Sequence, residues 1–106
     1  MKREIKRTKV KDLLVSETFE KKVLIKGWVR TKRGSRKIGF VAINDGSTIH
    51  NIQIIVDFSE FDEEIIKQIT TGACLSVKGT LVKSEGHGQN VEIYAEQIEV
   101  YGTVLK

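Results

Sequence analysis

The chain has 106 residues, of which 40% are hydrophobic, and it carries 18 Lys and Arg, 14 Asp and Glu, and one cysteine. This length fits one domain with a single core, and the composition is that of a folded chain. The single cysteine excludes a disulfide framework and a thiolate metal site. No run approaches the roughly 20 apolar residues that span a bilayer. We therefore expect one intracellular domain over residues 1–106.

The net charge of +4 is unevenly distributed along the chain. Fourteen basic residues face four acidic ones through Lys37, whereas the remaining four basic residues face ten acidic ones. A basic segment of this kind favours a polyanionic partner such as nucleic acid. Charge alone does not decide the matter, because a Lys-rich face is often simply a solvated surface.

The first half of the chain reads as an N-terminal extension followed by two strands. The extension covers residues 1–20, and Gly27 inside the first strand predicts a bulge or a bend there. The predicted elements are, in order, a short helical turn at 10–14, a strand at 22–30, a basic turn at 34–37, a strand at 38–43 and a turn at 44–47.

The second half contains one amphipathic helix between strands. Phe61, Ile65, Ile66 and Ile69 recur with helical spacing, and Gly72 follows them as a stop signal. The predicted elements are a strand at 51–56, the helix, a strand at 74–83, a flexible loop at 84–88 and a strand at 91–101. Cys74, at the start of one of these strands, is expected to be a buried packing residue.

Three strands, a helix and two more strands form the element order of one small all-β architecture. This is the OB-fold, a five-stranded Greek-key β-barrel, here with one short helix between strands three and four. In this fold oligonucleotides lie across strands two and three, flanked by the loops between strands one and two and between strands four and five. The residues of these regions are the candidates for a functional site.

Alternation along each strand predicts which side chains face solvent. In the second strand, Val41 and Ile43 are the natural core pair, which turns Phe40, Ala42 and Asn44 outward. The same alternation elsewhere places Ile52, Ile54, Val56, Val91, Ile93 and Ala95 in the core and turns Asn51, Gln53, Glu92 and Tyr94 outward.

The outward side chains suit single-stranded RNA. Phe40 would stack on an unstacked base, a contact worth roughly 1–3 kcal/mol. The amide of Gln53 matches the mixed edge of uracil, and the carboxylate of Glu92 accepts from the N–H groups of guanine. Phosphate contacts are assigned to the basic residues Arg30, Lys32, Arg33, Arg36 and Lys37.

Each assignment has an alternative that the sequence leaves open. Phe40 would complete the core if its strand were bulged, and Gln53 and Glu92 would serve equally as ordinary surface residues. His50 and His87 have no partners at metal-ligand spacing. We therefore predict no catalytic residue and no metal site in this chain.

Several ordered motifs resemble the anticodon-binding domain of the class IIb aminoacyl-tRNA synthetases, the aspartyl, asparaginyl and lysyl enzymes. The resemblance covers nearly the whole chain. Its motifs are VLIKGWVR at 23–30, GFVAINDGS at 39–47, IQ at 52–53, TG at 71–72, VKG at 77–79 and VE at 91–92. The turn at 45–47 with its long connection to Gln53, and GHGQ at 86–89, favour the asparaginyl type.

This resemblance implies roles for particular residues. By it, Phe40 stacks on the central anticodon uridine, Gln53 bonds that base, and Glu92 meets the first base, a guanine. Arg33 matches a basic residue near the anticodon, although strict alternation from Val23 would turn it inward, so its placement depends on a bend at Gly27.

The resemblance also implies a parent enzyme of protein biosynthesis. Such an enzyme uses ATP and Mg²⁺ to attach asparagine to tRNA(Asn), normally as a cytoplasmic homodimer, with no membrane involved. Its catalytic domain is expected to be absent from this chain, so the fragment itself would be no enzyme and would need no cofactor. The alternative hypotheses are an aspartyl relative, a sequence-tolerant single-stranded nucleic-acid binder, a protein-interaction barrel and a small stand-alone enzyme. For the last of these, the sequence shows no set of residues arranged for catalysis.

Overall fold

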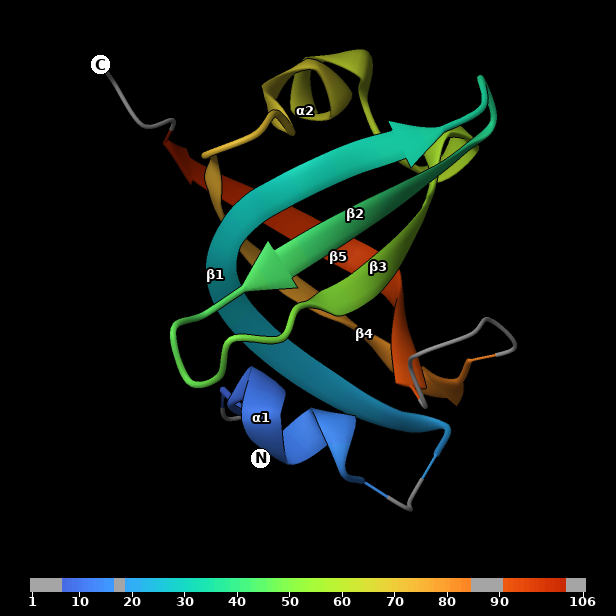
Figure 1. Ribbon diagram of the computed structural model, residues 1–106. Coiled ribbons are helices and arrows are strands. Elements are labelled where there is room, and N and C mark those ends of the chain that lie inside the picture. The colour runs from blue at the N-terminus through green and yellow to red at the C-terminus, as the bar shows by residue number, and fades with distance from the viewer. Residues whose placement is uncertain (1–6, 17–18, 85–90, 103–106) are drawn as a thin grey trace, which may run out of the picture.

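Five strands form a closed barrel in the computed structural model, which describes residues 7–16, 19–84 and 91–102 (Figure 1). The elements are α1 (Val10–Leu14), β1 (Lys21–Gly34), β2 (Ile38–Asn44), β3 (Ile52–Asp57), the 3₁₀ turn η1 (Phe58–Glu60), α2 (Glu63–Gln68), β4 (Cys74–Lys83) and β5 (Val91–Gly102). The predicted loop at 84–88 lies outside the described residues, apart from Ser84.

The strands follow each other around the barrel in the order β1-β2-β3-β5-β4, and β4 closes it by pairing with β1. β3 and β5 are parallel, and every other neighbouring pair is antiparallel. This is the Greek-key order of the OB-fold. The predicted fold class and the order of its elements are therefore confirmed.

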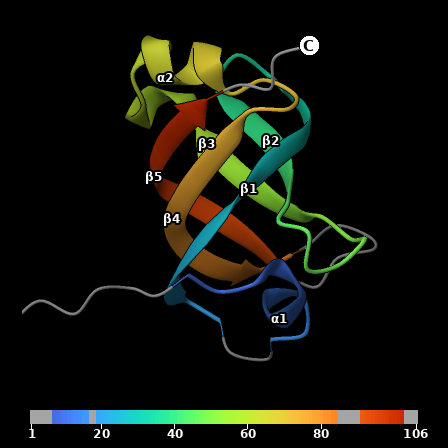
Figure 2. The same cartoon turned by 90° about the vertical axis from the view of Figure 1, so that its left-hand side faces the viewer.

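Alternating apolar side chains fill the barrel, and the two helices cover its ends (Figure 2). Val41, Ile43, Ile54 and Ile93 are all buried, as the alternation of their strands predicts. α1 closes one end with Val10 and Leu13, which are 0% and 1% exposed, and the segment around α2 closes the other with Ile69.

β1 is strongly curved, and two features allow this (Figure 1). A Cβ atom at Gly27 would lie 2.4 Å from the carbonyl oxygen of Asn44, so glycine permits the close passage of β1 over the end of β2. The irregularity in the ladder lies three residues later, where the register with β2 shifts between Val29 and Thr31. Val29 faces the core, and Thr31 and Arg33 follow on the outer face.

Two orientations predicted from sequence are wrong. Cys74 is exposed because Leu75 and Val77 take the inward positions of β4, which turns the even-numbered residues outward. Asn44 is buried at 9% exposure because it ends β2 under the following loop. Its Nδ2 donates to the carbonyl oxygens of Thr48 and His50, and its Oδ1 accepts from the N–H of Gly46.

Candidate nucleic-acid interface

Strand register assembles two rows of outward side chains across β1, β2, β3 and β5. Residues directly opposite on neighbouring strands share a face of the sheet. The first row is Thr31, Ala42, Gln53 and Glu92, and the second is Arg33, Phe40, Ile55 and Tyr94. We call this surface the two-row face.

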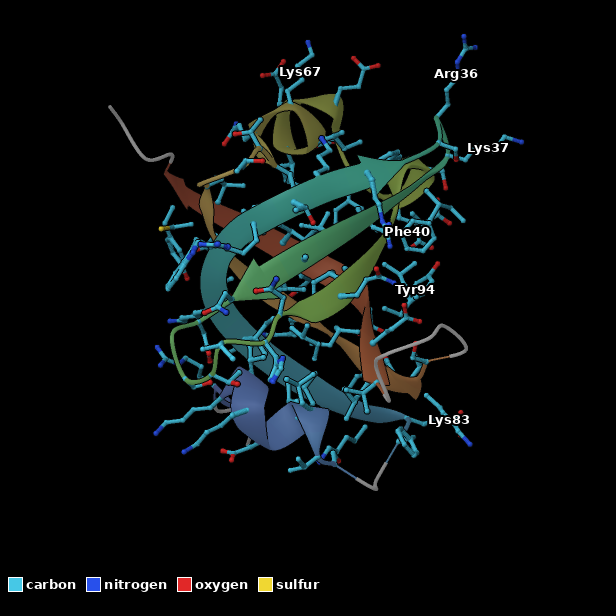
Figure 3. The ribbon with its side chains drawn as sticks, in the orientation of Figure 1. Arg36, Lys37, Phe40, Lys67, Lys83 and Tyr94 are labelled. Carbon is cyan, nitrogen blue, oxygen red and sulfur yellow. The ribbon has the colours of Figure 1, made fainter. Side chains whose placement is uncertain are left out.

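Phe40 lies on the two-row face rather than in the barrel. Its neighbours Val41 and Gly39 are buried, whereas Phe40 is half-buried. Figure 3 shows Phe40 and Tyr94 on the same side of the barrel, with Lys37 just before the start of β2. An aromatic ring on the outer surface of a sheet is suited to stack on an unpaired base.

Gln53 and Glu92 are hydrogen-bonded to each other. They are register partners on the parallel strands β3 and β5, and Nε2 of Gln53 donates to Oε2 of Glu92. The bond leaves Oε1 and one N–H of the amide, and Oε1 of the carboxylate, for other partners. The pair therefore presents two polar groups to solvent in a fixed mutual arrangement.

Tyr94 adds a second aromatic ring, to which the sequence reasoning gave no role. Its hydroxyl donates to Oδ2 of Asp57 at 3.5 Å. Desolvation raises the pKa of Tyr94, as do the negative charges of Glu60 and Asp57. The hydroxyl and backbone N–H of Ser59 lower the pKa of Asp57 by donating to its carboxylate. Alternation along β5 turns Tyr94 outward together with Glu92, so the sequence did predict its position on this face.

The predicted phosphate-binding residues lie in different settings. Arg33 pairs with Phe40 and is exposed, because the irregularity after Val29 restores its outward position. Arg30 is exposed within that irregularity. Arg36 and Lys37 occupy the exposed turn between β1 and β2 (Figure 3).

Lys32 contacts α2 at one end of the barrel. Its Nζ donates to the carbonyl oxygen of Ile66, in the last turn of α2, at 3.1 Å. The same atom lies 5.9 Å from the centre of the Phe58 ring. A cation at a helix C-terminus is electrostatically favourable, so Lys32 has a structural contact beside its predicted one.

Two hollows border the basic turn between β1 and β2, and the Phe58 ring lines both. One, of about 680 Å³, includes Arg36 and Lys37, and the other, of about 290 Å³, includes Lys32 and Arg33. A Cβ at Gly39 would meet the Phe58 ring at 2.5 Å, so a larger residue at this position would displace the ring. The larger hollow is also lined by Asp57 and Glu63, and the smaller one shares Arg33 with the two-row face.

The turn between β2 and β3 is tied to α1 at the other end of the barrel. The N–H of Val10 donates to Oδ2 of Asp45 at 2.9 Å, and the N–H of Lys11 donates to Oγ of Ser47 at 3.1 Å. Partial burial raises the pKa of Asp45, but the hydrogen bonds from Ser47 and Val10 outweigh it, so the pKa lies below its ordinary value of 3.8. The turn thus caps the first helix from a distance in sequence.

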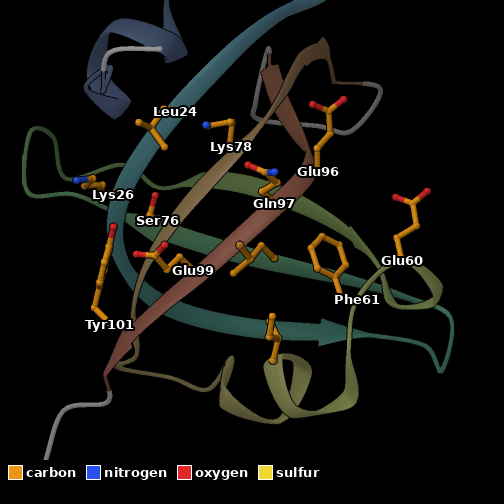
Figure 4. Close-up of a pocket in the computed structure, with 12 residues that line it drawn as sticks. Leu24, Lys26, Glu60, Phe61, Ser76, Lys78, Glu96, Gln97, Glu99 and Tyr101 are labelled. Carbon is orange, nitrogen blue, oxygen red and sulfur yellow. The ribbon is translucent and has the colours of Figure 1, made fainter. Parts of the chain in front are cut away.

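A further hollow, of about 560 Å³, lies over β1, β4 and β5 beside α2 (Figure 4). Its charges are of both signs, with Lys26 and Lys78 beside Glu96 and Glu99. Lys26 also lies over the ring of Tyr101, 5.8 Å from its centre. None of the residues predicted to bind RNA lines this hollow.

Within the described ranges, no group of three or more His, Cys, Asp or Glu side chains could hold a metal ion. The same part of the chain contains no helix of sufficient length and apolarity to cross a membrane.

Comparison with known proteins agrees with this fold. Residues 23–101 match the tRNA anti-codon family, described as an OB-fold nucleic acid binding domain. The chain is 59% identical over 99 residues to an asparagine–tRNA ligase of Bacteroides fragilis, a match that covers 93% of this chain and 21% of the relative. The chain thus spans about a fifth of the length of the curated relatives it matches.

Solved structures show the same architecture. The asparaginyl-tRNA synthetase of Pyrococcus horikoshii, complexed with asparaginyl-adenylate, aligns with a TM-score of 0.79 at 25% identity over 95% of this chain and 23% of that one. An OBody bound to hen egg-white lysozyme aligns with a TM-score of 0.77 at 17% identity over 97% of this chain and all of that one, which shows the fold alone.

The closed barrel and its strand order are those of an OB-fold domain. The chain belongs to the tRNA anti-codon family of such domains. Its 59% identity to an asparagine–tRNA ligase favours the asparaginyl over the aspartyl alternative.

Proposed function

We propose that the two-row face binds the unstacked anticodon bases of tRNA(Asn). Phe40 stacks on the central uridine, Gln53 bonds the edge of that base, and Glu92 accepts from the first base, a guanine. The observation that carries the proposal is the register of three strands, which places these side chains in adjacent rows.

The cations around the β1–β2 turn serve the RNA backbone in this proposal. Arg33 lies beside Phe40, and Arg36 and Lys37 extend from the end of the same face. Arg30 and Lys32 add positive charge near them. Binding is therefore expected to weaken with salt, since each neutralised phosphate of a single strand releases counterions.

The proposal extends to a larger parent protein. There, this domain directs a ligase that attaches asparagine to tRNA(Asn) with ATP and Mg²⁺, as a cytoplasmic homodimer. ATP and Mg²⁺ belong to the catalytic domain of this parent, and the proposal gives the described residues no catalytic step.

A binding titration tests the anticodon assignment. An anticodon stem-loop carrying GUU is expected to bind more tightly than an oligo-dT of equal length. Phe40→Ala is expected to remove most of the difference, since stacking on one ring contributes roughly 1–3 kcal/mol per base. Gln53→Ala is expected to act in the same direction by removing the edge contact.

Matched controls lie outside the two-row face. Tyr101→Ala removes an exposed ring and Gln97→Ala an exposed amide, both beside the hollow of Figure 4. Neither is expected to change the preference. Equal affinities of the wild-type chain for the two ligands would favour a sequence-tolerant single-stranded binder built on the same barrel.

A further inference from the structure

The hydrogen bond between Gln53 and Glu92 joins two groups that face different bases in the proposed function, on which this inference rests. Nε2 of Gln53 donates to Oε2 of Glu92 across β3 and β5. We propose that Glu92 is a positioning residue for Gln53: it fixes the orientation of the amide and thereby sets the preference for uracil over cytosine at the central base.

The chemistry of the two side chains allows one orientation of the amide. An ionised carboxylate only accepts hydrogen bonds, whereas an amide has a donating NH₂ and an accepting oxygen. Rotating the Gln53 amide by half a turn would place its Oε1 against the Glu92 carboxylate, so that two acceptors would face each other. Glu92 therefore holds the NH₂ group toward β5 and leaves Oε1 on the side away from it.

Strand register places Gln53 close to where a base stacked on Phe40 would lie. Ala42 is the register partner of Gln53 on β2, and Phe40 lies two residues before Ala42 on the same face. The short side chain of Ala42 leaves room for a base stacked on Phe40 to extend toward Gln53. The atom that such a base presents to Oε1 then decides which base binds.

Uracil and cytosine differ at that atom. Uracil has an N3–H that donates to Oε1, whereas cytosine has an unprotonated N3 that accepts. Cytosine would be accommodated if the amide turned over and offered its NH₂ to N3, but this would break the bond to Glu92. The carboxylate therefore opposes cytosine without touching it, because a mismatched acceptor is left unpaired.

The test separates this positioning role from the contact of Glu92 with the first base. The stem-loops carry an abasic site at the first anticodon position, and U or C at the central one, so that Glu92 has no base to contact. For the wild-type chain we expect a preference for U of about tenfold or more, the scale of discrimination by a well-placed bidentate contact. Glu92→Gln offers both a donor and an acceptor, so either amide orientation is satisfied and the preference is expected to fall to about threefold or less.

Two further variants complete the experiment. Glu92→Ala frees the amide by a different route and is expected to give the same loss of preference. Glu99→Gln makes the same charge change on the same strand, beside the hollow of Figure 4, and is expected to retain the wild-type ratio. Circular dichroism verifies that each variant is folded.

The outcomes distinguish this inference from the proposed function. A wild-type preference for U that Glu92→Gln and Glu92→Ala both lose supports the positioning role. If folded Glu92 variants keep the wild-type ratio, Glu92 does not act through Gln53, and the anticodon assignment remains. A wild-type chain with no preference for U over C would overturn the inference together with the assignment of Gln53.

Discussion

Gly79 is a position at which a single added methyl group should destabilise the barrel. It lies in β4 opposite Ala95, where the register between β4 and β5 shifts. A Cβ atom there would lie 2.2 Å from the carbonyl oxygen of Tyr94, whereas real Cβ contacts essentially never fall below 3.0 Å. The neighbour is backbone, so Gly79→Ala must move one strand by about 0.8 Å or more. Overpacking of this kind typically costs about 1–3 kcal/mol.

Urea unfolding measures this cost. The fluorescence of Trp28, the single tryptophan, reports unfolding, and we expect the free energy of unfolding to fall by about 2–3 kcal/mol. This corresponds to a fall in Tm of roughly 10–20 °C for a domain of this size. Ser76→Ala, at an outward position of the same strand, is expected to change stability by less than about 0.5 kcal/mol. A Gly79→Ala protein as stable as this control would refute the close approach of β4 and β5.

Two further predictions concern the cap of α1 and the cysteine. Asp45→Ala should lower the free energy of unfolding by about 1 kcal/mol near pH 7, the usual value of a lost helix cap. Because the folded pKa of Asp45 lies below 3.8, its stabilising contribution is present above the unfolded pKa and is lost as pH falls through the folded pKa. In paired urea titrations, the variant should therefore lose less stability than the wild type on acidification. Cys74 is exposed, so it should react with a thiol reagent in the native chain nearly as fast as in urea; protection in the native state would contradict its outward orientation.

Periodicity and turn residues predicted most of the fold. The alternation of Val41 and Ile43, and of Ile52 and Ile54, located the strands and their inner faces, because a side-chain period of two is a local property of the chain. The spacing of Ile65 and Ile69 located the helical segment between β3 and β4. The strand bounds were less certain, and β1 extends four residues beyond its predicted end to Gly34.

The outward orientation of Phe40, Gln53 and Glu92 was also available from alternation within single strands. The errors have local causes. Its residue type predicts that Cys74 is buried, whereas the alternation of Leu75 and Val77 marks it as outward. Alternation predicts that Asn44 faces solvent, but the loop after β2 folds over it and supplies its hydrogen-bond partners.

By itself, the sequence determined the strands, their apolar faces and the chemical groups turned to solvent, since these depend on neighbours along the chain. Tertiary structure alone decided which of those groups meet. The shift in register after Val29 brings Arg33 beside Phe40, and the parallel pairing of β3 with β5 joins Gln53 to Glu92 across 39 positions of sequence. Such contacts depend on strand pairing between distant segments, which no local pattern specifies.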